Sequence, residues 1–233
     1  MKYFGAGLSE LHKELSTIIR KQGEADHAKI LFLDLHAELH LSEITDQIPN
    51  DVDDLLKDLS YDEYRVMPTS KDETIAWSLW HLARIEDLTM NFLVAGENQI
   101  FHSEWEVKMN TPITDTGNAL TDDEIMNLSK KLNISALIAY RNAVGKRTQE
   151  IVKSLSFNDL KRKKVSPQGI DKIKEAGGVT DQKDSLWLLD YWGKKDIAGI
   201  LLMPPTRHAI LHLNDCGAFK YHIRKGKKCF RSG

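Results

Sequence analysis

The segment Thr74-Ile-Ala-Trp-Ser-Leu-Trp-His81-Leu-Ala-Arg-Ile-Glu-Asp87 decides the fold of this 233-residue chain. Its apolar residues recur with the 3.6-residue period of an α-helix. One stripe along this helix is formed by Thr74, Trp77, His81, Ile85 and Leu88. Because the stripe is mostly apolar, it predicts a helix that packs against the interior and points His81 inward. A capping box at Ser70–Glu73 predicts where this helix begins. Gly96 predicts that it ends at Val94.

Helical periodicity continues over nearly the whole chain, and the strict alternation typical of strands is hard to find. We therefore expect an all-α fold. The interior helix just described is joined by further helices expected over 8–48 with an interruption at Gly23, over 52–59, over 125–155 behind a capping box at Thr121–Glu124, over 184–203, and from Pro204 onward. Irregular structure is expected over 61–69 and 98–117, and short surface helices over 156–182.

Composition excludes several classes of function. The 32 basic and 34 acidic residues give a formal net charge of -2, so no nucleic-acid or anionic-membrane partner is expected. No apolar run is long enough for a membrane span, and two cysteines do not make a disulfide framework, so a cytoplasmic protein is expected. Residues 1–225 are expected to form one helical domain, and residues 226–233 a solvated basic tail.

Two histidine pairs have the i, i+4 spacing that places both imidazoles on one face of a helix. They are His36 with His40 and His208 with His212. The second pair lies among apolar residues and must be partly buried, and one metal ion can serve as partner to several buried imidazoles. Ordinary histidines bonded to the backbone or to water are the alternative. The first pair has acidic neighbours and is assigned to a solvated face.

His81 completes a set of three histidines on two helices, which is how metal sites are built inside helical bundles. Three neutral imidazoles leave a tetrahedral ion one open position for water or substrate. The sequence thus predicts one divalent metal ion on His81, His208 and His212. Zinc and nickel are the expected ions, with iron, manganese and copper as alternatives, since imidazole suits several metals.

Other polar residues near these motifs have two interpretations each. Asp215 is either a carboxylate partner of the ion or a solvated charge, and the solvated charge is favoured. Cys216 either reaches the site or is a small buried residue, and the buried residue is favoured. Arg84, Glu86 and Asp87 are expected to form ion pairs on the helix surface.

Together the two motifs resemble those of the DinB-like family. Thr74–Asp87 is similar to the family's second-helix motif, and His208-Ala-Ile-Leu-His212 to its last-helix motif. The resemblance covers about residues 8–225. It implies a four-helix bundle with up-up-down-down connectivity, a divalent metal on the three histidines, and a homodimer. The chain departs from many relatives at Leu213-Asn-Asp-Cys216, where they have a basic, glycine-containing turn. It is also longer over about residues 156–203, which implies additional short helices between the third and last bundle helices.

Some DinB-like proteins are metal-dependent thiol S-transferases or isomerases that use low-molecular-weight thiols. The resemblance therefore implies a metal-dependent enzyme of the S-transferase type acting on a small molecule. A metal-dependent hydrolase and a non-catalytic stress or interaction protein with a structural ion are the alternatives. No catalytic residue can be assigned, because the sequence identifies no base or oxyanion donor.

Overall fold

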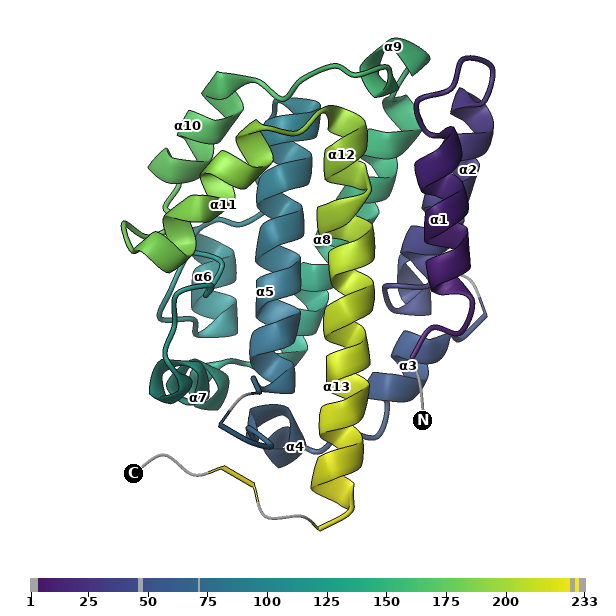
Figure 1. The fold of residues 1–233 in the computed structure, drawn as a ribbon. Helices are drawn as coiled ribbons and strands as arrows, with labels where there is room; N and C mark the ends of the chain where they lie inside the picture. The colour runs from purple at the N-terminus through teal and green to yellow at the C-terminus, as the bar shows by residue number, and fades with distance from the viewer. Residues whose placement is uncertain (1–3, 46–47, 71, 227–228, 231–233) are drawn as a thin grey trace.

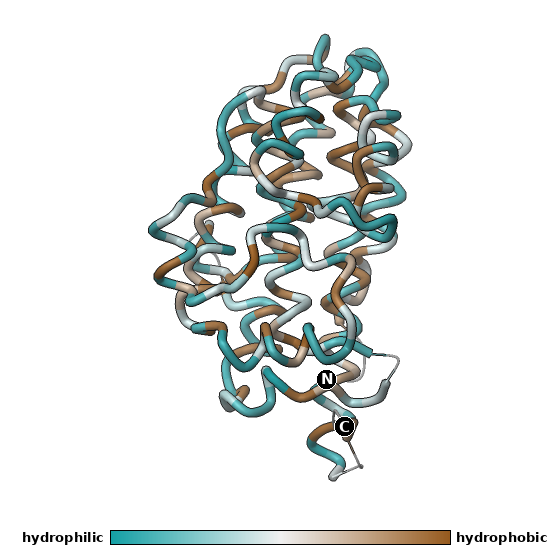
Figure 2. Tube along the Cα trace, turned by 90° about the vertical axis from the view of Figure 1, so that its left-hand side faces the viewer, coloured by the Kyte–Doolittle hydropathy of each residue, from teal (hydrophilic) through white to brown (hydrophobic). Residues whose placement is uncertain are grey.

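The computed structural model describes residues 4–45, 48–70, 72–226 and 229–230, and this part of the chain is all-helical (Figure 1). Within it there is no strand, only an isolated β-bridge between Lys164 and Asp196. The predicted all-α class is confirmed. Figure 2 shows that apolar and polar residues are interleaved along the helices. None of the helices in the described ranges is long and apolar enough to cross a membrane.

Short helices form the N-terminal region: α1 (Leu8–Ile18), α2 (Ala25–Ala37), η1 (Ser42–Ile44), α3 (Asp51–Leu56) and α4 (Tyr61–Arg65). The expected interruption at Gly23 is confirmed, and its φ of 87° suits glycine. Helix α4 replaces the irregular segment expected there. The reason is a capping box that the sequence interpretation missed, in which Ser60 accepts from the amide of Glu63 and the Glu63 carboxylate accepts from the amide of Ser60.

Helix α5 (Ile75–Leu88) and the π-helical segment η2 (Thr89–Ala95) form the central helix, which ends one residue beyond the predicted Val94, with Gly96 as its C-cap. All 14 residues of α5 are buried. The helix does not begin behind the Ser70 capping box, so that prediction is wrong. Instead Thr74 caps it, and its hydroxyl accepts a hydrogen bond from the amide of Trp77 at 3.0 Å.

The middle of the chain contains α6 (Ser103–Met109), α7 (Asp122–Lys131), α8 (Ile134–Ser154), α9 (Phe157–Leu160), α10 (Pro167–Glu175), α11 (Lys183–Gly193) and α12 (Ile197–Leu201). The capping box at Thr121 is confirmed, but the helix behind it is split, because Asn133 caps α8 separately. The expected helix over 184–203 is split in the same way by Asp196, which caps α12. Helix α6 lies where irregular structure was expected.

The last long helix combines α12, the π-helical segment η3 (Met203–His208) and α13 (Ala209–Arg224). It runs beside α5 in Figure 1, and α5 also packs against α8. Lys220 and Arg224 near its end form ion pairs with Asp58, and Arg224 also pairs with Glu63. These two basic residues precede the segment expected to be a solvated tail, and their ion pairs make them part of the fold.

Part of the C-terminal segment also contacts the core. The amide of Phe230 donates to the carbonyl of Met67 at 3.1 Å, and the Phe230 side chain packs against core residues. The expectation of a solvated tail is therefore wrong for Phe230. Lys227, Lys228 and Arg231, which belong to the same expectation, lie outside the described residues.

Candidate metal centre

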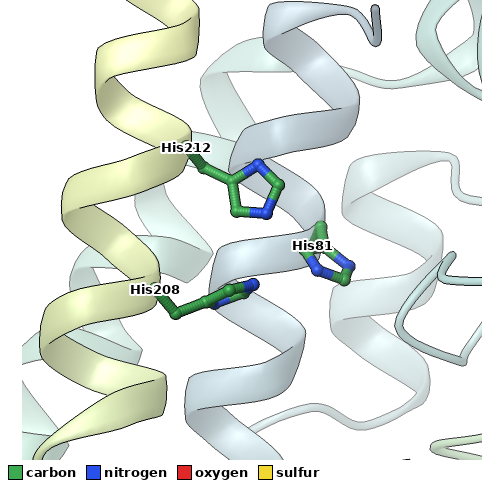
Figure 3. A group of neighbouring side chains, drawn as sticks. All are labelled: His81, His208 and His212. Carbon is green, nitrogen blue, oxygen red and sulfur yellow. The ribbon is translucent and has the colours of Figure 1, made fainter. Parts of the chain in front are cut away.

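Three histidines converge from two adjacent helices (Figure 3). His81 comes from the middle of α5, His208 from the end of η3, and His212 from the first turn of α13. One ring nitrogen of each lies within 4.8 Å of the others. Imidazole nitrogens bind zinc at about 2.0–2.1 Å, so small side-chain rotations would bring all three onto one ion. The structure thus brings together the three residues that the sequence selected.

In segment η3, which carries His208, side chains take the place of missing backbone hydrogen bonds. In an α-helix the carbonyl of Leu201 would accept from residue 205, but Pro205 has no N–H. The hydroxyl of Thr206 donates to this carbonyl instead, at 2.8 Å. Nε2 of His12 lies 2.8 Å from the next carbonyl, that of Leu202. The two prolines therefore widen the helix to a π-turn without leaving these carbonyls unsatisfied.

His81 is oriented by a loop whose successive carbonyls accept from α5 side chains. We call the carbonyls of residues 114–117 the carbonyl strip. The bonds run from Arg84 Nε to Thr114 at 2.9 Å, from Trp80 Nε1 to Asp115 at 3.0 Å, from His81 Nδ1 to Thr116 at 2.8 Å, and from Trp77 Nε1 to Gly117 at 3.1 Å. Because a carbonyl only accepts, Nδ1 of His81 carries the proton and Nε2 keeps its lone pair for a metal.

The strip needs glycine at its end. Gly117 has a φ of 72°, and a Cβ there would lie 2.9 Å from Nε1 of Trp77. The Trp77 ring in turn stacks on His81 with centroids 4.5 Å apart, and it meets His212 edge-on at 5.8 Å. Trp77 therefore fixes the loop and two of the three imidazoles together.

The donor set fits a divalent cation. The Nδ1 atoms of His208 and His212 are buried and have no hydrogen-bond partner among the described residues. Burial lowers the pKa of His81 to about 3 and that of His212 to about 4, and it holds the pKa of His208 well below its usual range. All three imidazoles are therefore neutral near pH 7, which is the form that binds metal.

A cavity of about 190 Å³ opens beside His81 and His208. Three aromatic residues of α11 form one side of it, and we call Trp187, Tyr191 and Trp192 the aromatic wall. The remaining lining residues are Ile85, Asn118, Leu188, Met203 and Pro204. A metal ion on the three histidines would have an open side toward this cavity.

The other histidine pair forms a second cluster, which the sequence interpretation missed. His36 and His40 are fully buried, so their assignment to a solvated face is wrong. Their Nε2 atoms lie 2.8 and 3.1 Å from the two carboxylate oxygens of Glu86 on α5. Together these three residues also have the composition of a metal site. The available signal was the apolar stripe on which both histidines lie, with Phe32 and Leu35 among its members.

Glu86 and its neighbours are buried, so the expected surface ion pairs are wrong too. Arg84 pairs with Asp87 at 3.2 Å, and both side chains are fully buried. Asp87 also accepts from the hydroxyl of Tyr140 at 2.6 Å and from the amides of Ile100 and Phe101. These charges anchor the loop that follows η2.

Asp215 and Cys216, three and four residues after His212, do not join the histidine group. Asp215 is exposed, in accord with a solvated charge. Cys216 is fully buried, and burial raises the pKa of its thiol to about 12, so the thiol stays protonated. The interpretation of Cys216 as a small buried residue is the one that fits the structure.

The chain belongs to the DinB superfamily, whose family model matches residues 44–180. The matched region contains His81 and Glu86 but ends before α11 and the last helix. The aromatic wall, His208 and His212 therefore lie outside it. Comparison with curated proteins gives no match.

Proposed function

We propose that this protein is a metal-dependent enzyme that binds one divalent ion on His81, His208 and His212 and transfers a thiol to or from a small molecule. One observation carries the proposal: three neutral imidazoles, with no fourth protein ligand among the described residues, converge at the edge of an apolar cavity. Membership of the DinB superfamily supports it. A divalent ion bound there would stabilise a thiolate and thereby lower the pKa of the thiol.

The chain's own residues prepare the site in three ways. The carbonyl of Thr116 fixes the tautomer of His81. The stacked ring of Trp77 restricts how His81 and His212 can turn. The aromatic wall supplies an apolar surface that excludes water from one side of the site.

We also infer the DinB-type arrangement of four long helices, α2, α5, α8 and the η3–α13 helix, with up-up-down-down connectivity. Contacts of α5 with α8 and α13, and of α2 with α8 and η3, support this arrangement. Helices α9 to α11 are then the additional short helices before the last bundle helix. The same proposal includes one domain over 1–225 followed by a short segment over 226–233 that contacts the core at Phe230. It also includes a homodimer, a cytoplasmic location, and zinc or nickel as the ion.

A metal-dependent hydrolase is the weaker alternative. Hydrolysis by a metal-bound hydroxide usually employs a nearby carboxylate or second base. Among the described residues that line the cavity there is no carboxylate. The lining is better suited to a thiol, which needs no base once its pKa has been lowered.

Elemental analysis of the protein purified without an affinity His-tag tests the proposal. We expect about one divalent ion per chain, and we expect affinity to fall by roughly a hundredfold or more in His81→Ala and in His208→Ala/His212→Ala. Circular dichroism should show that the helices persist. His27→Ala is the matched control, because His27 is exposed on α2. Full metal content in the double variant, or turnover that proceeds without added thiol, would contradict the proposal.

A further inference from the structure

The cavity beside the histidines has a size that restricts what it can hold. Its volume is about 190 Å³. An apolar cavity of about 150 Å³ holds one benzene ring. The space therefore accommodates a single six-membered ring with a short substituent, and it is too small for a large conjugate unless most of that molecule stays outside.

The lining also restricts the charge of the ligand. Apart from the Tyr191 hydroxyl and the indole N–H groups of the aromatic wall, its polar side chains are His81, His208 and Asn118, and no Asp, Glu, Lys or Arg occurs among the described lining residues. A carboxylate or phosphate that packed against the aromatic wall, away from the ion, would lose its hydration without a Lys or Arg partner among the described lining residues, which is costly. A cationic group is disfavoured as well, because the ammonium of Lys195 already lies 4.2 Å from the centre of the Tyr191 ring.

Part of the apolar surface of the aromatic wall remains exposed beside this cavity. Trp187 is 47% exposed although it is a large apolar residue, whereas Trp192 behind it is 1% exposed and anchors the helix. The rings of Trp187 and Tyr191 meet edge-on with centroids 5.7 Å apart. A flat ring placed against them would bury the exposed part of Trp187 and gain aromatic contacts.

The wall is held in place relative to the histidines by the loop that carries the carbonyl strip. Thr116 in this loop binds His81, and two residues later the side-chain amide of Asn118 donates to the carbonyl of Asp184 at the start of α11. The amide of Thr116 also donates to Gly178 at 3.1 Å, in the connection that leads to α11. One loop thus sets both the ligand nitrogen of His81 and the position of the aromatic wall.

We propose that this cavity selects a small, uncharged thiol with an aromatic ring, the ring packing on Trp187 and Tyr191 and the sulfur pointing toward His81 and His208. The inference rests on the proposed function and names the substrate class of the same site. Trp187 is the residue that determines this specificity, and it lies beyond the part of the chain that matches the family model.

Calorimetric titration of the full chain with two probe thiols tests this inference. Benzyl mercaptan is uncharged and aromatic, and mercaptosuccinate is anionic and aliphatic. For the zinc-loaded protein we expect benzyl mercaptan to bind at least tenfold more tightly. Trp187→Ala should reduce its affinity about tenfold and leave that of mercaptosuccinate unchanged. Tyr221→Ala is the matched control, because Tyr221 is an exposed aromatic residue outside this cavity.

A second arm uses metal-free protein and follows quenching of tryptophan fluorescence by benzyl mercaptan. Saturable quenching that weakens about tenfold in Tyr191→Ala, which removes a ring of the aromatic wall but keeps the Trp187 fluorophore, supports the inference even if no metal binds, in which case only the proposed function fails. If zinc binds but mercaptosuccinate binds as tightly as benzyl mercaptan, or if Trp187→Ala changes neither affinity, the inference is overturned while the metal centre stands.

Discussion

The two histidine clusters begin from the same i, i+4 spacing and differ in what meets them. Opposite His208 and His212 stands a third neutral imidazole, His81, and the group borders a cavity. Opposite His36 and His40 stands the Glu86 carboxylate, and all three residues are buried. In both clusters two Nδ1 atoms lack a hydrogen-bond partner among the described residues, those of His208 and His212 in the first and those of His36 and His40 in the second. The difference is that the first cluster has an open side, whereas in the second a buried carboxylate already bonds to Nε2 of both rings.

Charge and packing close the second cluster further. The buried guanidinium of Arg141 donates to the carbonyl of Leu39, and its positive charge balances the Glu86 carboxylate. Burial alone would raise the pKa of Glu86, but His40 and His36 hold it well below its usual range. Gly145 on α8 lies so near His40 that a Cβ would be 2.6 Å from Nδ1. Histidine spacing alone therefore only suggests a metal site. The group that faces the histidine pair decides whether the pair binds an ion or stabilises the fold.

Removal of one member of the second cluster should have the largest effect. His36→Ala leaves the buried Glu86 carboxylate with one donor fewer, so we expect the free energy of unfolding to fall by about 3 kcal/mol. Metal content should stay at about one ion per chain. Urea denaturation and elemental analysis measure the two quantities, with His27→Ala as the exposed control. A decrease from two ions to one would instead make this cluster a second metal site.

The pH dependence of stability should distinguish the clusters next. Burial, followed by the nearby Arg141, lowers the pKa of His40 to about 3, whereas an unfolded histidine titrates near 6.5. Below pH 6.5 the unfolded chain therefore binds a proton that the folded chain refuses, and stability falls as the pH drops toward 3. His40 alone should contribute a loss of about 2 kcal/mol between pH 6.5 and 5.

His40→Asn should remove this contribution. In metal-free protein the buried histidines of the first cluster add losses of the same sign, because their pKa values are lowered as well. Unfolding by urea at pH 7, 6 and 5 should therefore give a shallower dependence for His40→Asn than for the unchanged chain. Equal slopes for the two proteins would show that His40 is not a buried neutral group.

Loosening the carbonyl strip should have the smallest effect. Trp80→Phe keeps most of the side-chain volume and removes the hydrogen bond to the carbonyl of Asp115. Because Thr116 is the next residue, the hold on His81 should weaken and metal affinity should fall several-fold, less than for loss of a ligand. Competition with a chromophoric chelator measures the affinity. Trp105→Phe is the control, and equal affinity in the two variants would mean that the strip does not orient His81.

Much of the first cluster was predictable, because helical periodicity places His81, His208 and His212 at inward positions and the two motifs that contain them resemble those of the DinB-like family. The second cluster was not, since its decisive contact joins His36 to Glu86, 50 residues apart. Acidic neighbours suggested a solvated face, yet Asp34 is exposed while His36 beside it on the same helix is buried. Charged residues on α5 were misplaced for the same reason, because burial with partners from distant segments leaves no local sequence signal.

The helix boundaries depend on capping residues, and the sequence identified only some of them correctly. Ser60 and Thr121 both cap helices with the same pattern, yet the equally good pattern at Ser70 was overridden by Thr74. The aromatic residues of α11 were visible as part of a helix. Their approach to His208 was not, because it depends on the loop that links the carbonyl strip to α11.

Segment η3 also restricts the number of residues that the last helix can contain. A π-turn holds one residue more than an α-turn, so α12 and α13 are out of phase by roughly 100° about a common axis. Across this slip the apolar residues of α12 are buried in the core, while His208 and His212 meet His81 of α5. Chain length between Leu201 and His208 is thus under constraint in its own right: even where several residue types would serve at a given position, loss or gain of one residue there separates the packing of α12 from the direction of His208 and His212.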